Sequence, residues 1–392
     1  MTLVMAPNAL KGSCTAGAAA AALAAGARRV AAAAEIRQVP VADGGDGLVE
    51  IALQWPGAEP RTFRVTDPIQ RPVAATLAWL PVQRTAIIEM ALASGLALLA
   101  TSKRDPARTT TFGTGELMRH ALELGAETLI VGLGGSATND GGIGMAAALG
   151  YRFLDATGCE LEPVGMAVGQ IAQIDCSGCD PRLQRVKVQA VCDVENPLTG
   201  ARGAAWVYGP QKGATPAQVA ELDAGLERLA SRMREDLGCD PSAIAGAGAA
   251  GGLGAGLLAF CAAELRPGAD VILDLIGFDT ALAGADLVLT AEGQIDGQTA
   301  YGKAPAAVAA RAKQHGVACF AIAGGLGAGR EALHQLGLDA LFSLCPGPIS
   351  LDQAEQRVTE LLADAAEQAV RAFLAGVRAQ SSAGEGRYSH FA

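Results

Sequence analysis

The chain has 392 residues, which is enough for about two domains, because single hydrophobic cores seldom grow beyond roughly 250–300 residues. Half of the residues are hydrophobic but only 4% are aromatic, so we expect a large core built from small side chains. The formal net charge of −10 argues against a duplex-binding surface, which needs clustered lysine and arginine. We therefore expect no nucleic-acid partner.

The sequence also gives little support for a membrane protein or for a protein with a cysteine- or histidine-based metal centre. The chain has no apolar run of about 18 residues free of both charges and glycine-rich breaks, and its N-terminus lacks a signal-peptide pattern, so we expect a soluble, cytoplasmic protein. The nine cysteines indicate buried, reduced thiols, and Cys176 and Cys179 have no second pair to complete a zinc site. With four histidines, the chemistry must come mainly from Asp, Glu, Lys and the backbone.

The N-terminal segment alternates strand and helix. We predict a strand over Thr2–Ala6, a helix over Ala16–Ala34 and a strand over Ile36–Val41. Lys11 lies in the glycine-containing loop after the first strand. In so acidic a protein it is a candidate anion ligand, as are Lys212 and Lys303 in their own glycine-rich loops. Asp43 follows the second strand in the loop VADGGDG, at the carboxyl end where open α/β sheets bind ligands.

The middle of the chain carries a glycine-rich loop, VGLGGSATNDGGIGMAAALG, over Val131–Gly150. It follows a predicted strand over Thr128–Leu133 and leads into helix formers at Met145–Leu149. Glycines let backbone N–H groups point inward, and the next helix N-terminus adds positive potential, so we interpret the loop as an anion cradle. A sharp structural turn is the alternative. The cradle candidates are Gly134, Gly135, Ser136, Asn139 and Asp140.

A second polar loop, CDVENPLTG, follows the predicted strand Val186–Val191. It places Asp193 and Asn196 where they could bind Mg²⁺ or accept a proton. An Asx-turn before Pro197 explains the asparagine equally well. We therefore take Asp193 as the candidate for this loop.

The segment TAEGQIDGQTAYGKA over Thr290–Ala304 gathers Glu292, Asp296 and Lys303 after one predicted strand. Its G-x-x-x-x-G-K spacing matches a phosphate-binding P-loop, but alanine replaces the Ser or Thr that would bind magnesium, and the strand ends too early. We interpret Lys303 as an anion-neutralising lysine in a different kind of loop.

Another glycine-rich run, GAGAAGGLGAG over Gly246–Gly256, contains G-x-G-x-x-G without a preceding strand. Close approach of a second backbone explains it better than dinucleotide binding. The C-terminal part predicts strands and a closing helix over Asp286–Thr290, Cys319–Ala323, Ala340–Ser343 and Ala354–Val377.

These segments predict an α/β protein with two α/β domains. A doubly wound, mostly parallel sheet domain is built from both termini, residues 1–65 and 285–379. A second α/β domain, residues 66–284, is inserted into it. Residues 380–392 are expected to form a mobile tail.

Several motifs in this order resemble those of bacterial glycerate kinases that act as glycerate 2-kinases, over roughly Met1–Gly376. They are APNALKGS, VADGGDG, VTDP, IIEMALASGL, RDPARTTTFGTGEL, GLGGSATNDGGIGMAAALG, CDVENPLTG, YGPQKGA, GAGAAGGLGAG, AEGQIDGQT and GKAP. Similar proteins often have Asp-Ser-Phe where this chain has Asn8, Ala9 and Leu10, and glycine where it has Ala291. The first change removes a carboxylate at position 8.

The resemblance implies ATP- and Mg²⁺-dependent phosphorylation of D-glycerate, at the 2-hydroxyl to give 2-phosphoglycerate. In that reaction Lys11 and Lys303 would contact phosphate or substrate carboxylate. Glu292 and Asp296, or Asp43, would hold Mg²⁺. Asp193, or else Asp43, would accept the hydroxyl proton, and the cradle would bind an anion.

Three alternatives remain open at this point. Phosphorylation at the 3-hydroxyl would give 3-phosphoglycerate from the same residues with the acid turned around. A nicotinamide-dependent hydroxyacid oxidoreductase would use a glycine loop for pyrophosphate, and a sensor would bind a sugar acid without catalysis. The sequence leaves the oligomeric state open and is compatible with a homo-oligomer.

Overall fold

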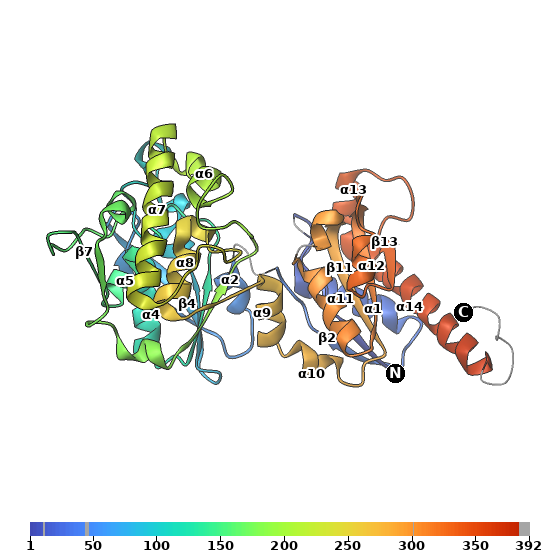
Figure 1. Ribbon diagram of the computed structural model, residues 1–392. Helices are drawn as coiled ribbons and strands as arrows, with labels where there is room; N and C mark the ends of the chain where they lie inside the picture. Colours follow the sequence, from blue (N-terminus) through green and yellow to red (C-terminus); the bar gives the residue numbers. More distant parts are fainter. Residues whose placement is uncertain (11, 44–46, 301, 384–392) are drawn as a thin grey trace. The chain divides into compact units, whose positions relative to one another are not determined.

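The computed structural model describes residues 1–10, 12–43, 47–300 and 302–383 (Figure 1). The chain divides into two compact units, and each is treated by itself below. The first unit contains Met1–Asp43 and Gly268–Ala392, and the second contains Gly44–Pro267. Within the described residues, no helix has both the length and the apolar character needed to cross a membrane.

The boundaries between the two units differ from the expected residues 65 and 284. Strand β3 (Glu59–Thr66) pairs along its whole length with β4 (Pro72–Leu80), so the chain has entered the second sheet well before Val65. At the other end, α9 (Gly268–Leu275) and α10 (Phe278–Leu282) bury apolar side chains in a core of the first unit. Strand pairing and the burial of apolar side chains therefore set the boundaries of the units. Both depend on tertiary contacts.

The first unit is built on a five-stranded sheet in the order β13-β12-β11-β1-β2, with every neighbouring pair parallel. Its strands are β1 (Thr2–Met5), β2 (Glu35–Gln38), β11 (Leu287–Ile295), β12 (Ala318–Leu326) and β13 (Ala340–Ser343). Successive residues of β1 point to opposite faces, so Leu3 and Met5 join one core while Val4 joins another. Both faces are therefore covered, as in doubly wound sheets.

Helices of the first unit cover both faces. They are α1 (Ala16–Arg28), α9, α10, α11 (Ala304–Gln314), α12 (Ala332–Leu336), α13 (Leu351–Gln356) and α14 (Val358–Ala383). Thr15 caps α1, since its hydroxyl accepts a hydrogen bond from the backbone N–H of Ala18 at 3.2 Å. Helix α14 contains the first four residues of the expected tail, and residues 384–392 lie outside the described part of the chain.

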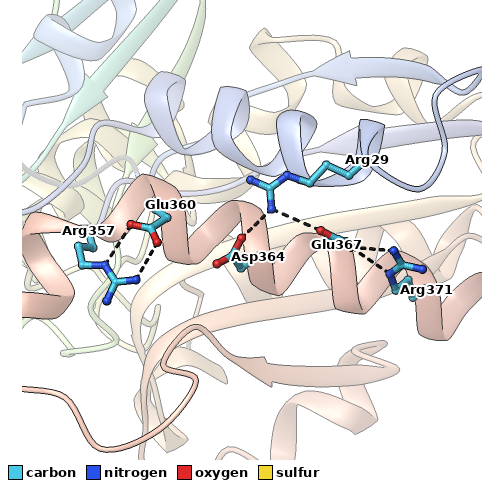
Figure 2. A network of polar contacts seen from close by, with 6 residues as sticks. All are labelled: Arg29, Arg357, Glu360, Asp364, Glu367 and Arg371. Atoms are coloured by element: carbon cyan, nitrogen blue, oxygen red, sulfur yellow. Dashed lines mark hydrogen bonds and ion pairs between the residues drawn. The ribbon is translucent and has the colours of Figure 1, made fainter.

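Helices α1 and α14 pack against one another and are joined at their surface by ion pairs. Figure 2 shows Arg29, just after α1, reaching Asp364 at 2.6 Å and Glu367 at 3.3 Å on α14. Arg371 also binds Glu367, at 2.8 Å, and these two arginines with their hydrogen bonds hold the pKa of that carboxyl below its ordinary value. Arg29 and Asp364 are exposed and Glu367 is half-buried, so close backbone packing, more than these pairs, must stabilise the contact.

Gly26 gives the clearest stability prediction at this contact. A Cβ atom at Gly26 would lie 1.9 Å from the backbone oxygen of Ala363 in α14. We expect Gly26→Ala to force the helices apart and to lower the free energy of unfolding by about 1–3 kcal/mol. Urea unfolding followed by circular dichroism measures the change.

Gly17 in the same helix is the matched control, because a Cβ there meets no atom within 4 Å. We expect Gly17→Ala to leave stability unchanged or raise it by up to about 1 kcal/mol, because alanine has the higher helix propensity. Equal stability of the two variants would contradict the close contact between the helices.

The second unit has a six-stranded mixed sheet in the order β10-β9-β6-β5-β4-β3. Besides β3 and β4, its strands are β5 (Thr85–Glu89), β6 (Thr128–Gly132), β9 (Lys187–Val191) and β10 (Glu264–Arg266). The β3-β4 and β4-β5 pairs are antiparallel, whereas β5, β6, β9 and β10 run parallel. A small antiparallel pair joins β7 (Arg152–Leu154) and β8 (Gln173–Asp175).

In the second unit, helices follow the parallel strands β5, β6 and β9, and one more precedes β3. They are α2 (Leu48–Ala52), α3 (Ala91–Ser94), α4 (Phe112–Glu123), α5 (Ile143–Ala148), α6 (Ala204–Tyr208), α7 (Pro216–Leu237) and α8 (Ala249–Cys261). Buried residues of β5, β6, α4, α7 and α8 together form one continuous hydrophobic core. The predicted fold class, two α/β units with mainly parallel sheets, is confirmed.

Candidate active site

The first unit has a cavity of about 610 Å³ at the carboxyl ends of its strands. It is lined by residues that follow β1, β2 and β13 and by the last part of β11 and β12. The chain runs from β1 outward to β2 on one side and from β11 outward to β13 on the other, so strand order reverses between β1 and β11. Open α/β sheets bind their ligands at such a switch point.

Asp43, Glu292 and Lys303 all line this cavity. Asp43 follows β2, and its Oδ1 accepts a hydrogen bond of 2.7 Å from the backbone N–H of Ala304, the first residue of α11. Lys303 is the residue just before that helix, and Glu292 lies in β11 with 8% of its surface exposed. The structure thus brings these three predicted residues to one cavity.

Asp296 lies elsewhere. Its carboxylate accepts hydrogen bonds from the backbone N–H of Gln298 at 2.9 Å and from Nε2 of Gln294 at 3.1 Å. It lines a separate cavity of about 550 Å³ beside Gly297 and Gly329. Among the residues that the structure describes, no three His, Cys, Asp or Glu side chains form a group that could hold a metal ion. Glu292 and Asp296 thus line two different cavities.

Two further residues of the N-terminal loop, Lys11 and Asn8, add no described charge to this cavity. Lys11 lies outside the described residues. Asn8 is buried, and its Oδ1 accepts a hydrogen bond of 2.8 Å from the backbone N–H of Ala9. This side chain holds the loop that follows β1.

The second unit has its own cavity, of about 440 Å³, at the carboxyl ends of β6 and β9. Gly134, Gly135 and Ser136 line it from the loop after β6, and Asp193 lines it from the loop after β9. Gly135 adopts a left-handed backbone with φ of +68°, and its carbonyl accepts from the N–H of Leu96 at 2.8 Å. No described residue accepts a hydrogen bond from the N–H groups of the three cradle residues. These donors suit an anion.

Asp140 shares the cradle sequence but not the cavity. Its fully buried carboxylate accepts hydrogen bonds from the N–H and hydroxyl of Thr111, at 2.7 and 2.8 Å, and from the N–H groups of Gly142 and Gly144. Burial raises its pKa, while these hydrogen bonds act in the opposite direction. Asp140 therefore holds the loop against the start of α4 and α5. Asn139 is also fully buried and is not among the residues that line the cavity.

Asn196, in the loop with Asp193, has a structural place. Its Oδ1 accepts a hydrogen bond of 2.7 Å from the hydroxyl of Tyr208, and its Nδ2 donates to the carbonyl of Arg202 at 2.8 Å. The side chain ties the loop to α6.

The glycine-rich start of α8 packs against the cradle loop. Ala250, Gly251 and Gly252 have left-handed backbones, and a Cβ atom at Gly251 would lie 2.0 Å from the carbonyl oxygen of Thr138. The expectation of a close backbone approach is confirmed. The G-x-G-x-x-G pattern is thus explained by packing, which removes the main support for a nicotinamide site.

The sequence indicated Lys212 as a candidate anion ligand by its glycine-containing loop but assigned it to no site. It ends the 3₁₀-helix η5 (Pro210–Lys212) and lines the second-unit cavity, although only 1% of its surface is exposed. Its Nζ donates to the carbonyl oxygen of Thr138 at 2.7 Å. The signal was present as one of few lysines, set in a glycine-containing loop, but burial cannot be read from such a pattern.

Lysines and carboxylates at the carboxyl ends of parallel strands, with backbone donors beside them, define an α/β enzyme suited to transferring charged groups. Comparison with known proteins then gives the family. The model of the "Glycerate kinase family" matches residues 3–374, and the chain belongs to this family.

Curated relatives agree over nearly the whole chain. A glycerate kinase of Halalkalibacterium halodurans is 49% identical, with 93% of this chain and 96% of that protein covered. A glycerate 2-kinase of Escherichia coli is 43% identical, with coverage of 90% and 93%. A crystal structure assigned to glycerate kinase 2 of Salmonella typhimurium LT2 superposes with a TM-score of 0.84 at 42% identity, covering 96% of this chain and 99% of that one.

Proposed function

We propose that this protein is an ATP-dependent kinase that phosphorylates D-glycerate on its 2-hydroxyl group, giving 2-phosphoglycerate and ADP. The observation that carries the proposal is the match to glycerate kinases along nearly the whole chain, including a relative named as a 2-kinase. The two cavities support it, because the motif residues Asp43, Glu292, Lys303 and Asp193 line them.

The first-unit cavity suits Mg²⁺ and phosphate. Magnesium prefers oxygen ligands and is usually held by one or two carboxylates together with substrate phosphates, so a cluster of three carboxylates is not required. Glu292 and Asp43 supply two carboxylates at one cavity, and Lys303 supplies a positive charge for phosphate oxygens. The metal ion, when bound, offsets the negative charge of the phosphoryl group. Asp296, whose oxygens accept two other hydrogen bonds, is the weaker metal ligand.

The second-unit cavity suits the acid. The N–H groups of Gly134, Gly135 and Ser136 offer hydrogen bonds to an anion, and Asp193 offers a carboxylate in the same cavity. In this account Asp193 accepts the proton of the reacting hydroxyl group as that oxygen attacks phosphorus. Asn139 and Asp140 act indirectly, because Asp140 shapes the loop that presents the cradle.

The proposal is tested by the magnesium dependence of ADP formation with D-glycerate as acceptor. If Glu292 holds the metal, Glu292→Gln raises the Mg²⁺ concentration needed for half-maximal rate by about tenfold or more, since even indirect partners of metal ions cost this much. Asp296→Asn, on the same strand end but at another cavity, serves as the matched control and is expected to leave that concentration unchanged. If Asp296→Asn raises this Mg²⁺ concentration more than Glu292→Gln does, the metal ligands are instead Glu292 and Asp296, the pair predicted from the sequence.

A further inference from the structure

Lys212 is held in the wall of the second-unit cavity by the fold around it. Gly213, the next residue, has φ of +97°, and a Cβ atom there would lie 2.4 Å from the carbonyl oxygen of Arg104. The Lys212 backbone N–H donates to the carbonyl of Gly209 at 3.0 Å, which closes the turn. The backbone is thereby fixed on both sides of the lysine, so its side chain can serve as a placed group.

A lysine ammonium has three N–H donors, and burying it with donors unused is costly. The structure records one hydrogen bond from the Lys212 Nζ, to the carbonyl oxygen of Thr138, although the side chain is 1% exposed. The residue also lines the cavity that contains the cradle and Asp193. An anionic ligand bound in that cavity would therefore be a suitable acceptor for the remaining N–H donors of Lys212.

Asp140, Cys192 and Tyr208, three titratable residues near this lysine, do not replace such a ligand. Asp140, which attracts the ammonium, already accepts four hydrogen bonds from Thr111, Gly142 and Gly144. Asp193, Cys192 and Tyr208 are the other titratable residues that line the cavity, and burial raises the pKa of the cysteine and tyrosine. Those two groups are therefore neutral near pH 7 and do not pair with the lysine.

We propose that Lys212 recognises the carboxylate of the acid substrate in the second-unit cavity, acting with the backbone N–H groups of Gly134, Gly135 and Ser136. The inference rests on the proposed function and deepens it by naming the specificity-determining residue. A lysine and a carboxylate at one small cavity suit the two ends of a short hydroxy acid. The carboxylate binds at Lys212, and the hydroxyl lies toward Asp193.

The buried position of Lys212 makes binding of the acid depend on pH. Burial lowers the pKa of Lys212 to about 7, with Asp140 acting in the opposite direction. Only the ammonium form attracts a carboxylate, and the carboxylate of the acid itself stays ionised throughout this range. Binding is therefore strongest below pH 7. Above it, the dissociation constant rises by up to about tenfold per pH unit, because the lysine must first take up a proton.

Titration calorimetry of the full chain with D-glycerate, without nucleotide, tests the proposal between pH 6 and pH 9. We expect wild-type affinity to fall as pH rises, with proton uptake on binding near pH 8, seen by comparing buffers of different ionisation enthalpy. Lys212→Met should weaken D-glycerate binding at pH 6 by about 10- to 100-fold and flatten the pH profile. Lys103→Met, which removes an exposed lysine of the same unit, should behave as wild type.

Two further ligands separate the sources of the anion. Glycerol lacks the carboxylate, so the ratio of its affinity to that of D-glycerate should lie closer to one in Lys212→Met than in the wild type. If Lys212→Met instead weakens ATP binding and leaves D-glycerate binding intact, the lysine binds phosphate and the proposal is overturned.

Wild-type protein that binds D-glycerate no more tightly than glycerol at pH 6 overturns the proposal without any variant, so misfolding of Lys212→Met cannot obscure the result. Binding is measured without turnover. Failure of the proposed kinase reaction would therefore appear separately, as the absence of phosphoglycerate.

Discussion

Asp193→Asn is expected to lower kcat by about 10²- to 10⁴-fold, the range typical of losing a general base. Asparagine keeps the size and hydrogen-bonding ability of the side chain in the second-unit cavity but cannot accept the hydroxyl proton. Because the residue acts in the chemical step, the affinity for ATP should stay within about twofold of wild type. Steady-state rates with D-glycerate and equilibrium nucleotide binding measure the two effects.

Glu195→Gln is the matched control for this prediction. Glu195 is exposed, lies two residues further along the same loop and does not line the cavity. We expect the control to retain wild-type kcat. If Asp193→Asn also retains it, Asp193 has no role in proton transfer, and Asp43 becomes the candidate.

Lys303→Ala is the second change with a large expected effect. The residue lines the first-unit cavity just before α11, where its charge adds to the positive potential of the helix N-terminus. Removing it should lower kcat/KM for ATP by about 10²- to 10³-fold, comparable to the loss of one donor to a charged transition state. Lys303→Arg should recover part of the rate, because it restores the positive charge.

Lys313→Ala offers a control at the other end of the same helix. Lys313 is exposed and donates to the carbonyl oxygen of Gln335 at 2.9 Å, far along α11 from the cavity. The variant should keep wild-type kcat/KM and show the same helical circular dichroism as Lys303→Ala. Wild-type turnover in Lys303→Ala would remove this lysine from the account.

Strands β1 and β13 could be predicted well from the sequence because they are short and consist mainly of apolar residues. The prediction for Ala340–Ser343 coincides with β13, and that for Thr2–Ala6 is one residue longer than β1. Strand β11 continues to Ile295, beyond the predicted end at Thr290, because Gln294 and Ile295 pair with Gly325 and Leu326 of β12. Polar and glycine residues indicate a loop until a partner strand supplies their hydrogen bonds.

Helix limits were harder to predict. The alanine-rich run to Ala34 predicts one helix, yet α1 ends at Arg28, and Ala34 donates to the carbonyl of Ala31 in a turn that leads into β2. Helix propensity alone gives no signal for this turn. The short connection to the next strand, a tertiary requirement, decides where the helix stops.

The site residues were predicted by type and by position after strands, which is local information. Asp193 and Gly134 meet at one cavity because β6 and β9 are parallel neighbours, a pairing that the sequence does not state. Asp140 and Lys212 show the limit most clearly. Both are buried ionisable residues in glycine-containing loops, yet one carboxylate is saturated by backbone donors while the lysine faces a cavity.

The most direct test of the central claim is ³¹P NMR of the purified protein with ATP, Mg²⁺ and D-glycerate. One spectrum separates 2-phosphoglycerate, 3-phosphoglycerate and free phosphate. The account predicts a growing 2-phosphoglycerate signal that appears together with ADP. A 3-phosphoglycerate signal would contradict the assigned hydroxyl group and reverse the acid in its cavity. Folded protein that forms neither phosphoglycerate would contradict the proposed function itself.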